Sequence, residues 1–300
     1  MRSAALHFIT RMAYRVERLR WFIGGTAALH LVGFVTVLSV GKDQRVPLTR
    51  SYVTWPQQGA EDKRFGFGTV AGGSVSIEAL VAAFFALSAV CQAVPAAVPA
   101  LWRPLSERLQ TQAIQPYRFV EYAFSASCLF LIAQLINGVT DLHHVVLVFA
   151  SMATVMLLGL LQELTAYYLR CIERAGGPPR SWEQFFLPHA IGWLLYVPLW
   201  YEAFDRFGLD LREIKPLAPP HWVVSFYYFL FFVFTSFGFA QAVQMVRLYR
   251  IGAADDRRLR AIAIESEYVY TLLSLVAKSV SGYFLLSGLL ASSTSGHYRR

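Results

Sequence analysis

Two charged residues stand alone within long apolar segments of the sequence. Lys278 is the only charged residue in the run Tyr270–Ala291, and Glu121 is flanked by apolar and small residues in YRFVEYAFSASCLFLIAQLI. An ammonium group at membrane depth costs a few kcal/mol, so it normally has a partner and a function. A desolvated lysine also loses its proton readily, and can then form a Schiff base with an aldehyde. The two residues therefore predict a buried cation with its counter-ion.

The composition indicates an integral membrane protein. Of the 300 residues, 56% are hydrophobic and only 15% are charged, where a soluble domain has roughly 25%. The apolar residues form blocks of roughly 20, long enough to cross a bilayer. The three cysteines have no metal-ligand spacing, so no metal site is expected. The net charge of +8 falls in short loops, which favours the positive-inside bias of membrane proteins over a nucleic-acid partner.

The apolar blocks predict an all-α protein, a single domain over residues 1–300 with seven transmembrane helices. The predicted spans are Trp21–Val40, Ile77–Ala97, Pro116–Asn137, His144–Leu164, Phe185–Tyr201, Trp222–Val246 and Glu267–Ala291. The fifth is short and contains Pro188 and Pro198, which can kink a helix. An N-terminal signal peptide is a competing interpretation of the first 40 residues. A retained first span fits better, because no small-residue cleavage site follows it.

The loops predict an orientation and one β-hairpin. Sixteen lysine and arginine residues lie on the side of the N-terminus and ten on the other side. This bias predicts a multi-pass protein of the cell membrane with a cytoplasmic N-terminus and an extracellular C-terminus. The long connection Gly41–Ser76 has two alternating runs around a Gly/Asp-containing turn, which is typical of a β-hairpin, here on the outer surface.

The neighbours of the two charges support the same chemistry. Ser274 lies one turn before Lys278 on the same helix face. Aromatic residues that could surround an extended apolar ligand are frequent in SFYYFLFFVFTSFGF, and Trp193 and Trp200 add to them from the fifth span. Other interpretations remain open. Glu121 could simply be stabilised near a helix start, and the aromatic residues could be packing residues. His30 is as readily a structural histidine as a proton acceptor.

Three segments together resemble the heliorhodopsin family, seven-helix retinal proteins whose membrane orientation is inverted relative to other microbial rhodopsins. They are YRFVEYAFSAS (Tyr117–Ser127), LLSLVAKS (Leu272–Ser279) and FFVFTSFGFAQAVQ (Phe231–Gln244). The first has Phe119 where the family usually has tryptophan.

The resemblance implies a role for several residues. Lys278 would hold all-trans retinal and Glu121 would be its counter-ion. The residues implied to lie in or beside the pocket are Tyr122, Ser125, Phe234, Gln241 and Ser274. The residues implied for a polar, proton-accepting cluster are His30, Ser88, Gln92 and Glu163. Glutamine at position 92, where the family often has histidine, cannot itself titrate. The Gly41–Ser76 hairpin corresponds to an outer loop that takes part in a homodimer.

Together with this resemblance, these observations predict a light sensor without enzymatic activity. Photoisomerisation of all-trans retinal on Lys278 would drive internal proton transfer in a slow photocycle, and no ion would be pumped. Its predicted partners are retinal, the lipid bilayer, a second copy of the chain and an unidentified cytoplasmic signalling partner. The alternative is a light-gated proton channel or transporter that uses Glu121 and Glu202. A third hypothesis, a transporter or intramembrane enzyme without retinal, has no metal-ligand or nucleophile motif to support it.

Overall fold

The computed structural model describes residues 2–54, 66–213 and 219–290 of the chain. Within them lie eight α-helices, two strands and a closing π-helix, Leu286–Leu290. The helices are α1 (Arg2–Val40), α2 (Ile77–Ala97), α3 (Pro99–Gln112), α4 (Pro116–Ile136), α5 (Leu142–Arg174), α6 (Trp182–Glu213), α7 (His221–Arg250) and α8 (Asp256–Leu285), and the strands are β1 (Arg45–Thr54) and β2 (Gly66–Ser76).

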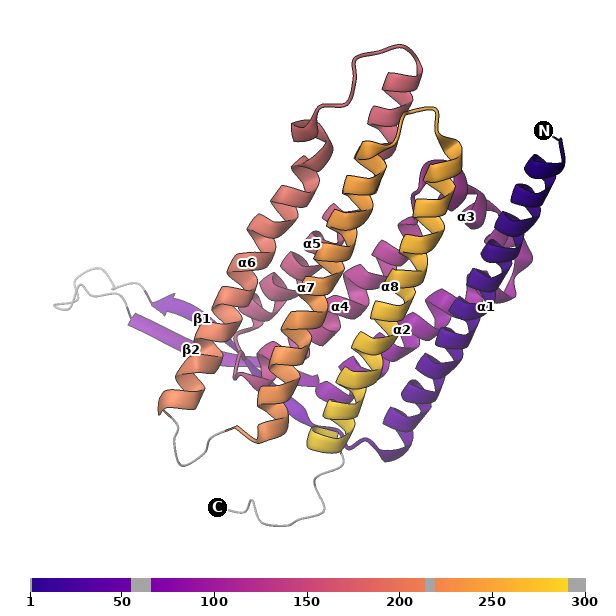
Figure 1. Ribbon diagram of the computed structural model, residues 1–300. Coiled ribbons are helices and arrows are strands. Elements are labelled where there is room, and N and C mark those ends of the chain that lie inside the picture. The colour runs from indigo at the N-terminus through magenta and orange to yellow at the C-terminus, as the bar shows by residue number, and fades with distance from the viewer. Residues whose placement is uncertain (1, 55–65, 214–218, 291–300) are drawn as a thin grey trace.

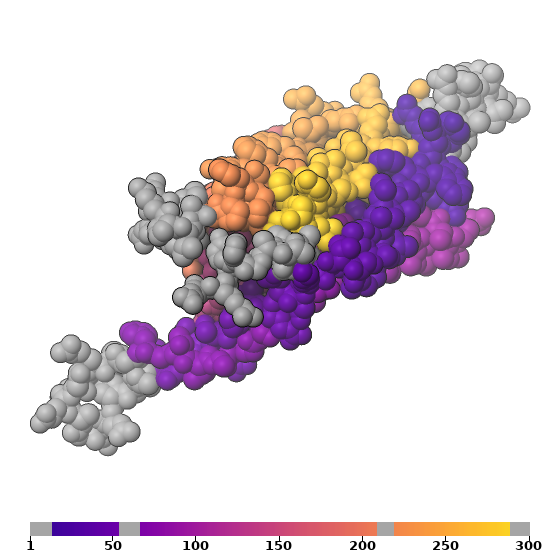
Figure 2. Space-filling model, turned by 90° about the horizontal axis from the view of Figure 1, so that it is seen from below, coloured from indigo at the N-terminus to yellow at the C-terminus, as the bar shows by residue number. Residues whose placement is uncertain are grey.

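The long helices form one bundle of two layers. Figure 1 shows α6, α7, α8 and α1 in front, with α5, α4 and α2 behind them. Neighbours around the bundle follow the chain order, and contacts between α8 and α1 close the ring. The short helix α3 packs at one end against α2 and α8. Seen from below, the hairpin strands project sideways beyond the helices (Figure 2).

The predicted membrane bundle is confirmed, with one refinement. Six of the described helices are long and apolar enough to cross a membrane: α1, α2, α4, α5, α7 and α8. The predicted fifth span, Phe185–Tyr201, lies within α6, which is not among these six. That helix is continuous from Trp182 to Glu213 although it contains Pro188 and Pro198, and it runs beside α5.

Two features of the connection between the second and third spans differ from expectation. Helix α3 was not predicted because it is amphipathic and short; it buries Trp102 and Leu109 and ends at Ala113, which adopts the left-handed conformation (φ 57°). Arg118, which lies at the start of the predicted third span and was included in the count of basic residues on the N-terminal side, is buried in α4. Arg170, also counted on the N-terminal side, is likewise buried, in α5, so the count overstated the exposed loop charge.

Helix α4 is the centre of the bundle. In its most apolar window 78% of the residues are buried, against 22–44% in the other candidate spans. It contacts both α2 and α5, so that most of its faces are covered by protein. A polar side chain on α4 therefore has little access to lipid or solvent and must find partners on neighbouring helices.

The predicted hairpin between the first two spans is confirmed. Strands β1 and β2 pair antiparallel from Arg45–Ser76 to Thr54–Gly66, with a bulge between Leu48 and Thr49. The predicted turn lies in residues 55–65, outside the described residues. The hairpin is joined to the start of α5, because the Thr49 amide donates to the Thr140 carbonyl at 2.9 Å.

Asp141 completes this junction. Its carboxylate accepts hydrogen bonds from the Ser51 hydroxyl (2.7 Å) and amide (3.1 Å), and from the amides of His143 and His144 at the start of α5. Asp141 is thus the N-cap of α5 and also fixes β1.

This geometry predicts a pH dependence for the hairpin junction. The bonds from Ser51 and from the His144 amide lower the pKa of Asp141 from 3.8 to about 2. Because the pKa is depressed on folding, the stabilisation is fully present above pH 4 and is lost as the pH falls towards 2. Hydrogen exchange should show the Ser51 amide protected at pH 5, and less protected in Asp141→Ala at that pH. Equal protection in the two proteins would contradict this role.

Candidate functional site

Lys278 and Glu121 form a buried ion pair at the middle of the bundle. The Lys278 Nζ donates to Glu121 Oε1 at 2.6 Å and to Ser274 Oγ at 2.8 Å. Glu121 Oε1 also accepts from the hydroxyls of Ser88 and Ser125, both at 2.7 Å. The two charged side chains are only 6% and 3% exposed. The contact that the sequence could only suggest is thus present.

The local sequence explains how the pair is supported. Ser274 precedes Lys278 by one helical turn on α8, and Ser125 follows Glu121 by one turn on α4, so each hydroxyl shares a face with its charge. Ser88 arrives from α2. A buried ion pair is tolerated when further hydrogen bonds satisfy it, and removal of one partner typically costs about 3–5 kcal/mol. Three helices are therefore held together at this point.

An apolar space begins directly at Lys278. A first pocket of about 390 Å³ lies beside the lysine and is lined by Tyr122, Ser125, Ala126, Leu129, Met156, Phe234, Phe237, Ser274 and Ala277. A second pocket of about 630 Å³ shares Tyr122, Met156, Phe234 and Phe237 with it, and extends between α5, α6 and α7. The two pockets share four lining residues and together form one slot that runs from Lys278 between the helices.

The slot is shaped by aromatic rings and by two glycines. The Tyr122 ring centroid lies 5.1 Å from Lys278 Nζ, and Trp193 closes the slot from α6. A Cβ atom at Gly238 would lie 2.9 Å from the Trp193 ring, and one at Gly159 would collide with Phe119. An extended apolar aldehyde joined to Lys278 fits this slot, because the reactive amine is at one end and the walls are apolar.

Most residues predicted for the pocket lie at the slot. Tyr122, Ser125, Phe234 and Ser274 line it next to Lys278. Gln241 lines the part further from the lysine, where its Nε2 donates to the Gly159 carbonyl at 2.9 Å.

Trp200 lies elsewhere. It belongs to the aromatic core, where its ring contacts those of Phe130, Phe231 and Phe234. Trp193, seven residues or about two helical turns earlier on α6, is the tryptophan that lines the slot.

The four residues predicted for a proton cluster separate into two groups. Ser88 contacts Glu121 directly. His30 is fully buried beside Phe85, and neither ring nitrogen has a hydrogen-bond partner among the described residues. Gln92 accepts from the Thr26 hydroxyl at 2.7 Å. Glu163 lies apart from these residues, in a second buried group of charges.

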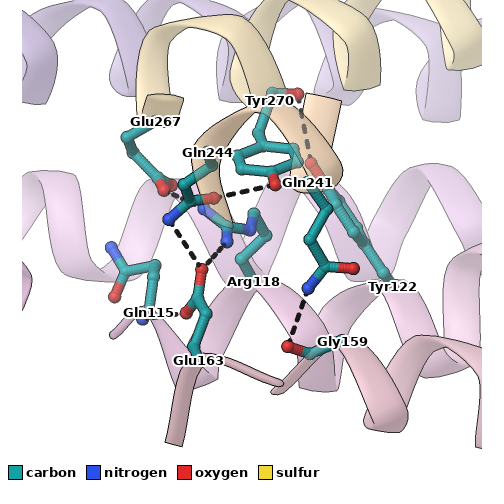
Figure 3. A network of polar contacts seen from close by, with 9 residues as sticks. All are labelled: Gln115, Arg118, Tyr122, Gly159, Glu163, Gln241, Gln244, Glu267 and Tyr270. Carbon is teal, nitrogen blue, oxygen red and sulfur yellow. Dashed lines mark hydrogen bonds and ion pairs between the residues drawn. The ribbon is translucent and has the colours of Figure 1, made fainter. Parts of the chain in front are cut away.

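That second group, here called the arginine cluster, consists of Arg118, Glu163 and Glu267 (Figure 3). The Arg118 guanidinium donates to Glu163 Oε1 at 2.5 Å and forms a short ion pair with Glu267. It also lies against the Tyr270 ring, 3.8 Å from the centroid. All three charged side chains are at most 6% exposed. Gln244 joins the cluster by donating to Glu163 at 3.3 Å and accepting from the Tyr270 hydroxyl at 2.8 Å.

Sequence reasoning missed this cluster. Arg118 and Glu267 lie near the ends of apolar segments, where charges normally face the membrane surface. The available signal was weak: three charges on three different spans lie at the same end of the bundle, each close to an apolar run.

A third pocket connects the two buried groups. It has about 480 Å³ of space, and its lining includes Glu121 from the ion pair together with Arg118 and Glu267 from the arginine cluster. Gln92 and Tyr117 also line it. The ion pair and the arginine cluster therefore face one common space.

Glu202, the residue of the alternative hypothesis, belongs to a different contact group. Its carboxylate accepts from Gln134 Nε2 at 3.1 Å, lies 3.3 Å from His144 Nε2 and pairs with Arg206.

Comparison with known proteins identifies the family. A comparison with curated protein sequences gives no match. Among solved structures, the crystal structure of the transmembrane domain of Salpingoeca rosetta rhodopsin phosphodiesterase is similar at 12% identity, with a TM-score of 0.49, over 93% of this chain and 89% of that one. A family model described as heliorhodopsin matches residues 19–290. Since this match spans most of the sequence, the chain belongs to the heliorhodopsin family of retinal-binding rhodopsins.

Proposed function

We propose that this protein is a light sensor in which all-trans retinal is attached to Lys278 and a proton moves only within the protein. The observation that supports this most strongly is the buried Lys278–Glu121 contact of 2.6 Å at the head of an apolar slot. The sequence has four lysines, and Lys278 is the only one within the predicted spans. Retinal, when bound through the Lys278 nitrogen, supplies light absorption and a change of shape about a double bond.

The residues around Lys278 would hold and move the proton. Glu121 stabilises a positive charge on the Lys278 nitrogen, and is close enough to take up its proton directly. Ser88 and Ser125 fix the Glu121 carboxylate, so that the proton is received and returned at one oxygen, Oε1.

The surroundings favour return of the proton over its export. Towards the hairpin end of the bundle, the core around α7 and α8 is apolar and includes Phe226, Leu230 and Leu285, all fully buried. These apolar side chains can neither take up nor pass on a proton. We therefore propose that the proton stays among the polar groups on the side of the third pocket.

The orientation and partners are proposed on the same basis. Basic residues on the side of the N-terminus favour a cytoplasmic N-terminus. The loop at Arg247–Arg260 on that side is basic and suits anionic lipid or an acidic signalling protein. Some of its charges are paired within the chain; Asp256, for example, pairs with Arg174 of α5. The hairpin is the proposed contact of a homodimer.

A light-gated proton channel is the competing function. It requires a polar route from Glu121 to Glu202, at the end of the bundle where the hairpin lies. Light-driven currents under voltage clamp that disappear in Glu202→Gln would establish this function. We expect no such current in the wild type, because large apolar side chains such as Phe226 and Leu230 make up much of the core at that end.

Replacement of the lysine tests the proposed attachment. Purified protein with all-trans retinal should show a visible absorption band that is absent in Lys278→Ala, because the alanine cannot form the bond. Lys42→Ala, which removes an exposed lysine beyond α1, is the matched control and should keep the band. A band of wild-type intensity in Lys278→Ala would contradict the assignment.

Blocking the slot tests its role without altering the ion pair. Gly238→Phe places a ring where even a Cβ atom lies 2.9 Å from Trp193, so we expect at least a tenfold lower yield of the visible band. Gly25→Phe is the control, because a Cβ atom there has no neighbour within 4 Å. Helical circular dichroism would confirm that both variants are folded. Equal yields in the two variants would show that the ligand occupies another space.

A further inference from the structure

The arginine cluster has an excess of carboxylates over cations. Among the described residues, three acidic side chains are buried: Glu121, Glu163 and Glu267. Glu121 has Lys278 as its cation, whereas Glu163 and Glu267 share Arg118. With both carboxyls ionised, the cluster would bear one uncompensated negative charge inside the bundle.

A buried negative charge without a counter-ion is strongly unfavourable. When two carboxyls share one buried site, the usual outcome is that one of them keeps its proton. The groups that face the pair include one cation, Arg118, and otherwise neutral side chains such as Gln244 and Tyr270. The neutral form of the cluster, with one proton, is therefore favoured.

The hydrogen bonds indicate which carboxyl keeps the proton. Glu163 accepts from three donors: the Arg118 guanidinium (2.5 Å), the Gln115 backbone amide (2.8 Å) and Gln244 Nε2 (3.3 Å). Within the part of the chain that the structure describes, the Glu267 carboxyl has Arg118 as its hydrogen-bond partner. Donors stabilise an ionised carboxylate, so this difference in hydrogen bonding favours Glu267 as the carboxyl that keeps the proton.

Glu267 also faces Glu121 across the third pocket. Both residues line this space, to which Gln92 and Tyr117 add further polar groups, and it is large enough to hold water. A change of charge at Glu121 therefore alters the field at the Glu267 carboxyl, because both groups are buried where the effective dielectric constant is lower than in bulk water.

We propose that Glu267 is a second proton-binding residue, which holds a proton in the dark and senses the charge of Glu121 across the pocket. A cluster that is already neutral is a poor acceptor for a further proton. A proton released from the Lys278 nitrogen therefore stays near Glu121 and does not pass to the arginine cluster. The role in the light response rests on the proposed function, whereas the proton held in the dark does not.

Infrared spectroscopy of the protein without retinal tests the dark state. At pH 7 exposed carboxyls are ionised, so a carbonyl band of a protonated carboxyl must come from a buried one. We expect one such band from Glu267 in the wild type and its complete loss in Glu267→Gln. The band should persist in Glu265→Gln, a control that alters an exposed glutamate two residues away.

Two further variants make the assignment independent of one mutant. In Glu163→Gln the remaining carboxyl becomes the sole partner of Arg118 and should ionise, so the band should disappear although Glu267 is still present. In Glu121→Gln the Glu267 band should remain but shift in frequency, because the facing negative charge is gone. The proposal is overturned if the wild type has no such band, if the band survives in Glu267→Gln or Glu163→Gln, or if it is unshifted in Glu121→Gln.

The retinal-loaded protein then tests the response to light. Uptake of a proton by Glu121 should shift the Glu267 band in the same direction as Glu121→Gln does. A pigment whose illumination leaves the band unmoved would overturn the sensing role. Absence of any pigment would instead contradict the proposed function, and would leave the dark-state band as a separate result.

Discussion

The requirement to pair a buried lysine determines much of this structure. Lys278 lies on α8, where burial makes its charge unfavourable unless a carboxylate and further hydrogen-bonding groups are present. Those groups come from α4 and α2, so the ion pair fixes the relative depth of three helices that are distant in the sequence. Helix α4 can provide the carboxylate because it is covered on both sides by protein. The apolar slot then begins where the amine ends, which places a reactive nitrogen at the head of a ligand-sized space.

A second set of charges extends this organisation towards one end of the bundle. The arginine cluster joins α4, α5 and α8, and it shares a pocket with the ion pair. These charged groups therefore lie on one side of Lys278, whereas the core on the other side includes large apolar side chains such as Phe226.

Sequence reasoning reached the ion pair but not its wider setting. Lys278 and Glu121 were recognisable because each interrupts an apolar run, and the segments around them resemble one family closely. Arg118 and Glu267 were not, since a charge near the end of an apolar run is usually a surface residue, and its burial depends on helices elsewhere in the chain. The same limit applies to Trp200 and Trp193, because composition shows that α6 supplies aromatic rings but not which ring faces the slot. Helix α3 escaped notice because amphipathic helices of 14 residues resemble polar loops in an apolar sequence.

The most direct test of this account is a double-mutant cycle on the ion pair in the protein without retinal, with the free energy of unfolding as the measured quantity. Lys278→Met and Glu121→Gln should each lower it by about 3–5 kcal/mol, because each leaves one buried charge without its partner. The double variant should be more stable than either single variant, since no unpaired charge remains. Losses that simply add in the double variant would show that the two residues do not interact, and would contradict the central place given to this pair.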